Sequence, residues 1–115
     1  MTIMHIGPRS GIRWPDILRA APMLVLFKHS PHCGFSRAAE LDIRDFANTH
    51  PQLPVLQVDV IRQRELSTLI ARHLDIPHAS PQIILLERGV PVWSAQHGRV
   101  TAAALEGALA ASATK

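Results

Sequence analysis

The sequence has little of what would crosslink the chain or carry it through a membrane. Among its 115 residues there is one cysteine, and only 4% are aromatic. A single cysteine excludes an internal disulfide, which favours a reducing compartment. Residues 1–15 lack the hydrophobic segment of a secretory signal. The longest apolar run, residues 22–27, is much shorter than the roughly 20 residues that cross a bilayer. We therefore expect a soluble, cytoplasmic protein with no membrane partner.

The basic residues of the chain are dispersed. The formal net charge is +3, from 12 basic and 9 acidic residues. The arginines spread from Arg9 to Arg99 with acids interleaved among them. A nucleic-acid site would need basic residues gathered on one face, usually with stacking aromatics. We therefore expect no nucleic-acid partner.

Length and composition predict one globular domain. The chain is 47% hydrophobic and 18% charged, which is enough for one core in a chain too short for two ordinary domains. Residues 1–13 show no clear period and are interpreted as an N-terminal arm, extended or loosely ordered. The folded domain is expected to span residues 14–113.

Hydrophobic periodicity predicts alternating helices and strands. In chain order we expect a short helix at 15–21, a buried strand at 23–27, a helix at 34–48, a strand at 55–60, an amphipathic helix ending before Pro77, strands at 82–86 and 90–95, and a last helix at 102–111. Residues 87–89 are expected to form a hairpin turn, and Thr101 to cap the last helix. This order is that of a thioredoxin-like α/β fold with a four-stranded mixed sheet and helices on both faces. Other α/β folds share parts of it.

The only cysteine follows the first predicted strand and precedes the strongest predicted helix. Cys33 is therefore expected at a helix N-terminus, where free N–H groups and the helix dipole stabilise a thiolate. His29 and His32 would add positive charge when protonated, and the Ser36 hydroxyl would donate a hydrogen bond to the sulfur. These features predict Cys33 as a redox nucleophile and Ser36 as its catalytic partner.

Two other interpretations of this segment stay open. Free cysteines are often small buried hydrophobes, although a polar approach containing a proline and two histidines is unlike a packed core. A metal site is the second alternative, because His29, His32 and Cys33 are soft ligands within five residues. No fourth ligand is evident, so our prediction is that the site holds no metal.

The segment before the third predicted strand carries the second candidate site. Ser80 and Pro81 stand where a helix gives way to a strand, a place where a backbone donor can be spared. Thioredoxin-like proteins have a cis-proline here, facing the active cysteine, and the backbone of the preceding residue pairs with an extended substrate. We therefore predict a cis Ser80–Pro81 bond and a substrate-binding role for both residues.

With both sites in view, the chain resembles the monothiol bacilliredoxin family, the thioredoxin-like proteins of the bacillithiol system, over roughly residues 14–110. The resemblance is carried by Phe27-Lys28-His29-Ser30, Ser36, Val58-Asp59-Val60, His78-x-Ser80-Pro81-Gln82, Val92-Trp93, and His97 followed by Thr101.

The resemblance implies a thiol-disulfide oxidoreductase that removes bacillithiol from mixed disulfides on proteins. Cys33 would be the attacking sulfur, and a second bacillithiol would resolve the adduct as co-substrate, with no tightly bound cofactor. Lys28, His29 and His32 join the expected substrate-binding residues. The expected partners are S-thiolated client proteins and a low-molecular-weight thiol, and the protein is expected to be a monomer.

One departure from the family leaves an alternative function open. The family commonly has proline after the cysteine, whereas Gly34 and Phe35 follow it here. Cys33-Gly-Phe-Ser36 is also the signature of monothiol glutaredoxins, which can bridge a [2Fe–2S] cluster between two subunits with glutathione. The alternative is therefore a cluster carrier with Cys33 as ligand. A thioredoxin-like interaction domain without turnover is a third possibility.

Overall fold

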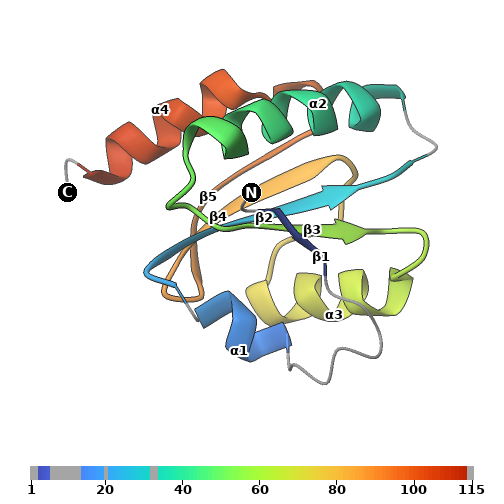
Figure 1. The fold of residues 1–115 in the computed structure, drawn as a ribbon. Coiled ribbons are helices and arrows are strands. Elements are labelled where there is room, and N and C mark those ends of the chain that lie inside the picture. Colours follow the sequence, from blue (N-terminus) through green and yellow to red (C-terminus); the bar gives the residue numbers. More distant parts are fainter. Residues whose placement is uncertain (1–2, 6–13, 20, 32–33, 114–115) are drawn as a thin grey trace.

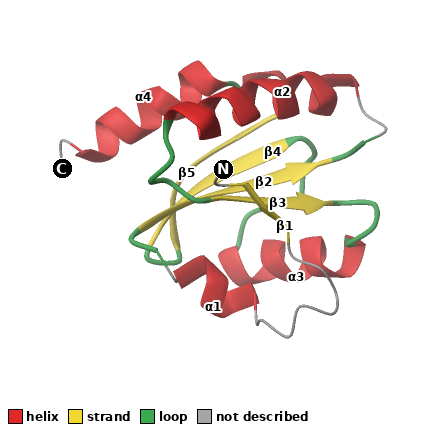
Figure 2. Cartoon of the chain, in the orientation of Figure 1, coloured by secondary structure: helices red, strands yellow, loops and turns green. Residues whose placement is uncertain are grey.

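A five-stranded mixed sheet with helices on both faces forms the protein (Figures 1 and 2). The computed structural model describes residues 3–5, 14–19, 21–31 and 34–113. The elements are β1 (Ile3–His5), α1 (Trp14–Arg19), β2 (Met23–His29), α2 (Gly34–Thr49), β3 (Val55–Asp59), α3 (Arg64–Leu74), β4 (Gln82–Glu87), β5 (Val90–Gln96), the 3-10 turn η1 (His97–Arg99) and α4 (Ala102–Ala113). All the predicted helices and strands are present, with ends shifted by a few residues.

The sheet confirms the thioredoxin-like architecture and adds one strand to it. The strand order is β1-β3-β2-β4-β5. β2 pairs parallel with β3 and antiparallel with β4, and β4 pairs antiparallel with β5. The four predicted strands are therefore found, and the short β1 pairs parallel with β3 at the sheet edge. A strand of three residues is too short to show a side-chain period, so residues 3–5 could not be recognised as a strand within the predicted N-terminal arm.

Alternation along β2 divides the interior into two cores. Val25 and Phe27 pack with α2 and α4, whereas Leu24 and Leu26 pack with α1 and α3. The helix pairs cover opposite faces of the sheet, as Figure 1 shows. Because β2 is interior and covered on both faces, its side chains are buried from residue 24 to residue 29. Consecutive residues at its carboxyl end must therefore enter different cores.

Backbone features agree with the local predictions. The Ser80–Pro81 bond is cis, as predicted. Thr101 caps α4, because its Oγ1 accepts a hydrogen bond from the Ala104 N–H at 3.1 Å. None of the helices among the described residues combines the length and apolarity that a membrane span requires.

The β4–β5 hairpin turns on two residues with positive φ. Glu87 pairs with Val90, which leaves Arg88 at φ 52° and Gly89 at φ 84° as the two turn residues. Two positive φ angles are typical of a type I′ turn, whose twist matches that of the strands. A Cβ on Gly89 would also lie 2.6 Å from Cγ of Arg19.

We expect Gly89→Ala to lower the free energy of unfolding by roughly 1–3 kcal/mol, because a non-glycine residue is strained at positive φ. Gly107→Ala is the matched control: a Cβ there meets nothing within 4 Å, and alanine is favoured over glycine in a helix interior by about 1 kcal/mol. Urea denaturation of both variants checks the pair. Equal stability changes would contradict the assigned turn.

Candidate active site

The candidate site is built around the junction of β2 and α2. Cys33 and His32 lie outside the described residues, so their predicted roles stay predictions. By sequence Cys33 directly precedes Gly34, the first residue of α2. The first turn of α2 contains no acidic residue that would oppose an anion at the helix N-terminus. The described neighbours on both sides give the surroundings of the cysteine position.

Ser36 joins the end of β2 to the first turn of α2. The residue is fully buried, and its Oγ accepts a hydrogen bond from the Ser30 N–H at 2.8 Å. The same Oγ lies 3.0 Å from Nδ1 of His29. The Ser36 hydroxyl therefore connects the end of β2 to the first turn of α2, the two elements on either side of Cys33 in the sequence. In the sequence, Ser36 is three residues after Cys33.

His29 continues this network away from Ser36. The side chain is 8% exposed, and its Nε2 lies 3.3 Å from Oε2 of Glu40 in α2. The same carboxylate oxygen accepts a hydrogen bond from Nε2 of Gln57 in β3 at 2.7 Å. A continuous set of polar side chains thus runs from Gln57 through Glu40 and His29 to Ser36.

Glu40 and Gln57 were absent from the sequence prediction. Glu40 occupies a helix position that the polar pattern assigns to solvent, and Gln57 stands inside an apolar strand. A polar residue in the middle of a buried strand needs a partner, and that requirement is the signal that could have found Gln57. Its partner depends on how α2 packs on β3, which the sequence does not specify.

Lys28, predicted to bind substrate, is fully buried on the opposite face of the sheet from His29. Its Nζ donates a hydrogen bond to the Ser67 carbonyl oxygen of α3 at 3.0 Å and lies 3.4 Å from Nδ1 of His78. The Ser67 hydroxyl lies 3.1 Å from the same ring nitrogen. The contacts of Lys28 are therefore with α3 and with the segment that leads to Pro81.

Burial makes the charged form of Lys28 costly. It lowers the pKa of the ammonium from 10.5 to about 8. The pKa of His78 is also lowered, first by partial desolvation of the ring and then by the positive charges of Lys28 and Arg64. A neutral imidazole nitrogen can accept a hydrogen bond from the Lys28 ammonium. The lowered pKa of His78, which favours the neutral ring, is therefore consistent with this contact.

The Pro81 segment contains two buried polar atoms without partners among the described residues. They are Ser80 Oγ and Gln82 Oε1. The Gln82 amide nitrogen donates to the Pro77 carbonyl oxygen at 3.0 Å, and the Pro81 carbonyl oxygen accepts from the His97 N–H at 2.9 Å. The segment is thus held on both sides, while the Ser80 hydroxyl keeps its hydrogen-bonding capacity.

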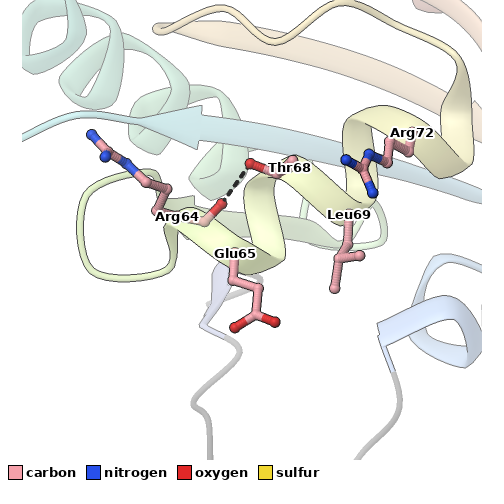
Figure 3. Close-up of a pocket in the computed structure, with 5 residues that line it drawn as sticks. All are labelled: Arg64, Glu65, Thr68, Leu69 and Arg72. Atoms are coloured by element: carbon pink, nitrogen blue, oxygen red, sulfur yellow. Dashed lines mark hydrogen bonds between the residues drawn. The ribbon is translucent and has the colours of Figure 1, made fainter.

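The described part of the chain contains no cluster of three or more histidine, cysteine or acidic side chains arranged to hold a metal ion. Cys33 and His32, two of the three proposed soft ligands, lie outside that part. A surface depression on α3 is lined by Arg64, Glu65, Thr68, Leu69 and Arg72. Figure 3 shows that these side chains point apart, and the one bond drawn joins Thr68 Oγ1 to the Arg64 carbonyl oxygen. The depression does not form a site with convergent groups.

Comparison with known proteins identifies the family. The model of the monothiol bacilliredoxin BrxC family matches residues 13–105. The chain belongs to this family. The matched residues include the Cys33 segment, the Glu40 and Gln57 partners of His29, and the cis-proline segment.

Solved structures similar to this family member have the thioredoxin fold. A candidate oxidoreductase with a thioredoxin fold is 22% identical, with a TM-score of 0.82 and 94% of each chain covered. Thioredoxin from Trypanosoma brucei brucei is 14% identical, with a TM-score of 0.79, 98% of this chain and 92% of that chain covered. Oxidised thioredoxin from Plasmodium falciparum is 14% identical, with a TM-score of 0.73, 96% of this chain and 98% of that chain covered. Family and fold together make the protein a thiol oxidoreductase.

The buried Lys28 gives a pH dependence that can be measured. Its native pKa of about 8 lies below the unfolded value of 10.5. The native state therefore binds fewer protons than the unfolded chain between these pH values, and the stability cost of charging Lys28 is fully present below about pH 8 and fades toward pH 10.5. We expect the free energy of unfolding of the wild type to rise relative to Lys28→Met across this range.

Urea denaturation of both proteins at the two ends of the range measures the difference. Lys28→Met keeps the apolar stem and removes the titrating group, so other titrations cancel between the two proteins. A difference in stability that stays constant with pH would contradict the buried ammonium.

Proposed function

We propose that this family member removes bacillithiol, or a similar low-molecular-weight thiol, from mixed disulfides on client proteins, with Cys33 as the attacking sulfur. The observation that carries the proposal is the buried hydrogen-bond network that ends at Ser36, three residues after the only cysteine. The match to the bacilliredoxin family over residues 13–105 supports the choice of thiol.

The reaction is two thiol-disulfide exchanges. The Cys33 thiolate attacks the bacillithiol sulfur of the mixed disulfide, a bond from that sulfur to Cys33 forms, and the client sulfur leaves as a thiolate. A second bacillithiol thiolate then attacks the same bacillithiol sulfur. Cys33 leaves as a thiolate, and the two small thiols are released as their disulfide. No net oxidant or reductant beyond these thiols is needed.

Ser36 assists this chemistry without replacing the external thiol. The chain has no second cysteine, so an internal disulfide cannot release the adduct from Cys33. A hydroxyl near the sulfur can donate a hydrogen bond to the thiolate both when it attacks and when it leaves. In the cis-proline segment, the Ser80 hydroxyl and the backbone beside Pro81 supply polar groups for a bound thiol or client segment.

We expect Cys33→Ser to abolish exchange, because it removes the nucleophile. Ser36→Ala should slow exchange by roughly 10- to 150-fold, since a hydrogen bond to a charged group contributes roughly 1.5–3 kcal/mol. The measurement is the rate at which a bacillithiolated model protein regains its free thiol. Ser94→Ala, the same change at an exposed position on β5, is the matched control and should keep the wild-type rate.

Mass spectrometry of Cys33 after exposure to oxidised bacillithiol and, separately, oxidised glutathione identifies the small thiol. A bacillithiol adduct that forms faster than the glutathione adduct supports the proposal. Full activity in Cys33→Ser would remove Cys33 from the mechanism. A stable brown dimer after anaerobic reconstitution with iron and sulfide, together with failure to accept either thiol, would favour the cluster carrier instead.

A further inference from the structure

The proposed exchange uses the Ser80–Pro81 segment but leaves the buried Lys28 without a role. The register partner of Lys28 on β4 is Gln82, so both side chains lie on the face of the sheet that α3 covers. The Nζ of Lys28 donates to the Ser67 carbonyl oxygen at 3.0 Å and lies 3.4 Å from Nδ1 of His78. A client cannot touch a fully buried ammonium, so a part for Lys28 must be exerted through these neighbours.

His78 connects Lys28 to the segment between α3 and β4. This segment, residues 75–81, contains no helix or strand and is therefore positioned by individual contacts. Its two prolines are held by hydrogen bonds to their carbonyl oxygens. Between the prolines, the ring of His78 reaches back to the sheet, where its Nδ1 lies beside Lys28 and 3.1 Å from the Ser67 hydroxyl. The ring thus ties the middle of the segment to β2 and α3.

The neighbours of Nδ1 determine where the ring of His78 carries its proton. An ammonium only donates hydrogen bonds, so a ring nitrogen that accepts from Lys28 has no proton of its own. The neutral ring therefore carries its proton on Nε2. The Ser67 carbonyl oxygen holds the ammonium beside the ring, because it accepts from the same Nζ.

Protonation of His78 removes this link. Both nitrogens of an imidazolium are donors, and Nδ1–H would face a second positive charge at 3.4 Å. The ring is exposed to solvent protons, whereas Lys28 is buried and cannot turn its charge to water. Desolvation of the ring, followed by the positive charges of Lys28 and Arg64, lowers the pKa of His78 from its ordinary 6.5. The link is therefore intact at neutral pH and fails as the pH falls through that lowered value.

Charged groups from several elements surround this ring. Lys28 comes from β2 and Arg64 from the start of α3, while Arg72 and Asp75 line the same surface depression as His78. Arginine keeps its charge throughout the range in which histidine titrates, and Asp75 supplies a carboxylate to the set. Of these four groups, Lys28 is the one in contact with Nδ1.

We propose that Lys28 is a positioning residue that fixes the Ser80–Pro81 segment through the neutral ring of His78, and that protonation of this ring frees the segment and weakens client binding. The inference rests on the proposed function, in which this segment supplies polar groups to a bound thiol or client. Lys28 acts on affinity rather than on the exchange of sulfur bonds, because it does not touch the client. The titration of the Cys33 thiol is a separate effect that every variant with an intact cysteine shares.

The dependence of KM on pH tests this role. For a bacillithiolated model protein we expect the wild-type KM to rise about fivefold between about pH 7.5 and about pH 5, as for one lost hydrogen bond. Lys28→Met should have the raised KM at both pH values. His78→Asn keeps an acceptor near the Nδ1 position that does not titrate, so its KM should stay low at both. The kcat of each variant should match the wild-type value at the same pH.

His73→Asn, at an exposed histidine of α3, is the matched control and should keep the wild-type profile. Circular dichroism at both pH values establishes that each variant is folded. An unchanged KM in Lys28→Met at about pH 7.5, or the wild-type rise in KM in His78→Asn, would overturn the proposal. A loss confined to kcat would also do so.

NMR tests the link without any substrate. Long-range proton–nitrogen spectra should show the neutral ring of His78 with its proton on Nε2. The heteronuclear NOE of the Ala79 and Ser80 amides should fall as the ring titrates, because a freed segment gains fast motion, and it should stay constant in His78→Asn. A neutral ring protonated on Nδ1, or an NOE that does not respond to the titration, would overturn the proposal.

The two measurements separate this inference from the proposed function. The expected NMR response in a protein that exchanges no thiol would reject the proposed function and retain the positioning of the segment by Lys28. Exchange that proceeds without the NMR response would reject the positioning and retain the proposed function.

Discussion

The alternation of side chains along β2 is the constraint on which the site depends. β2 is interior in the sheet and covered by helices on both faces, so neither direction offers water to a polar side chain. The chain nevertheless places Lys28 and His29 at its carboxyl end. Each must find partners inside the protein, and alternation sends one to α3 and the other to α2. Two polar networks among the described residues begin at these adjacent positions.

The same constraint fixes the ends of the cysteine loop. His29 is the last residue of β2, and Ser30 follows it. Both contact Ser36 in the first turn of α2, His29 through a ring nitrogen and Ser30 through its backbone N–H. Lys28 meanwhile contacts His78, three residues before Pro81. The carboxyl end of β2 thus contacts both the first turn of α2 and the segment that leads to Pro81.

How much the sequence could predict depends on the range of each interaction. Apolar runs and helical periods are local, so the order of elements, the hairpin and the Thr101 cap could be predicted. His29 and Ser36 were singled out because they are close to Cys33 in the chain, and the structure brings the two into contact with each other. Glu40 was missed because a charged residue on an amphipathic helix is ordinarily solvated, and only the packing of α2 on β3 brings it to Gln57. The expected role of Lys28 in substrate binding came from the family resemblance alone, and its burial could not be foreseen because it depends on β2 staying covered beyond the apolar run.

Ser36, in the first turn of α2, connects the buried network to the chemistry that we propose for a protein with one cysteine. In a dithiol relative the second sulfur both stabilises and releases the first, by forming a disulfide with it. A hydroxyl cannot form that bond, so the contribution to Cys33 that we propose for Ser36 is a single hydrogen bond. In the proposed exchange, release is left to an external thiol, and the part left to this chain is stabilisation of the thiolate near Ser36, whose hydroxyl is held by the Ser30 N–H and contacts His29.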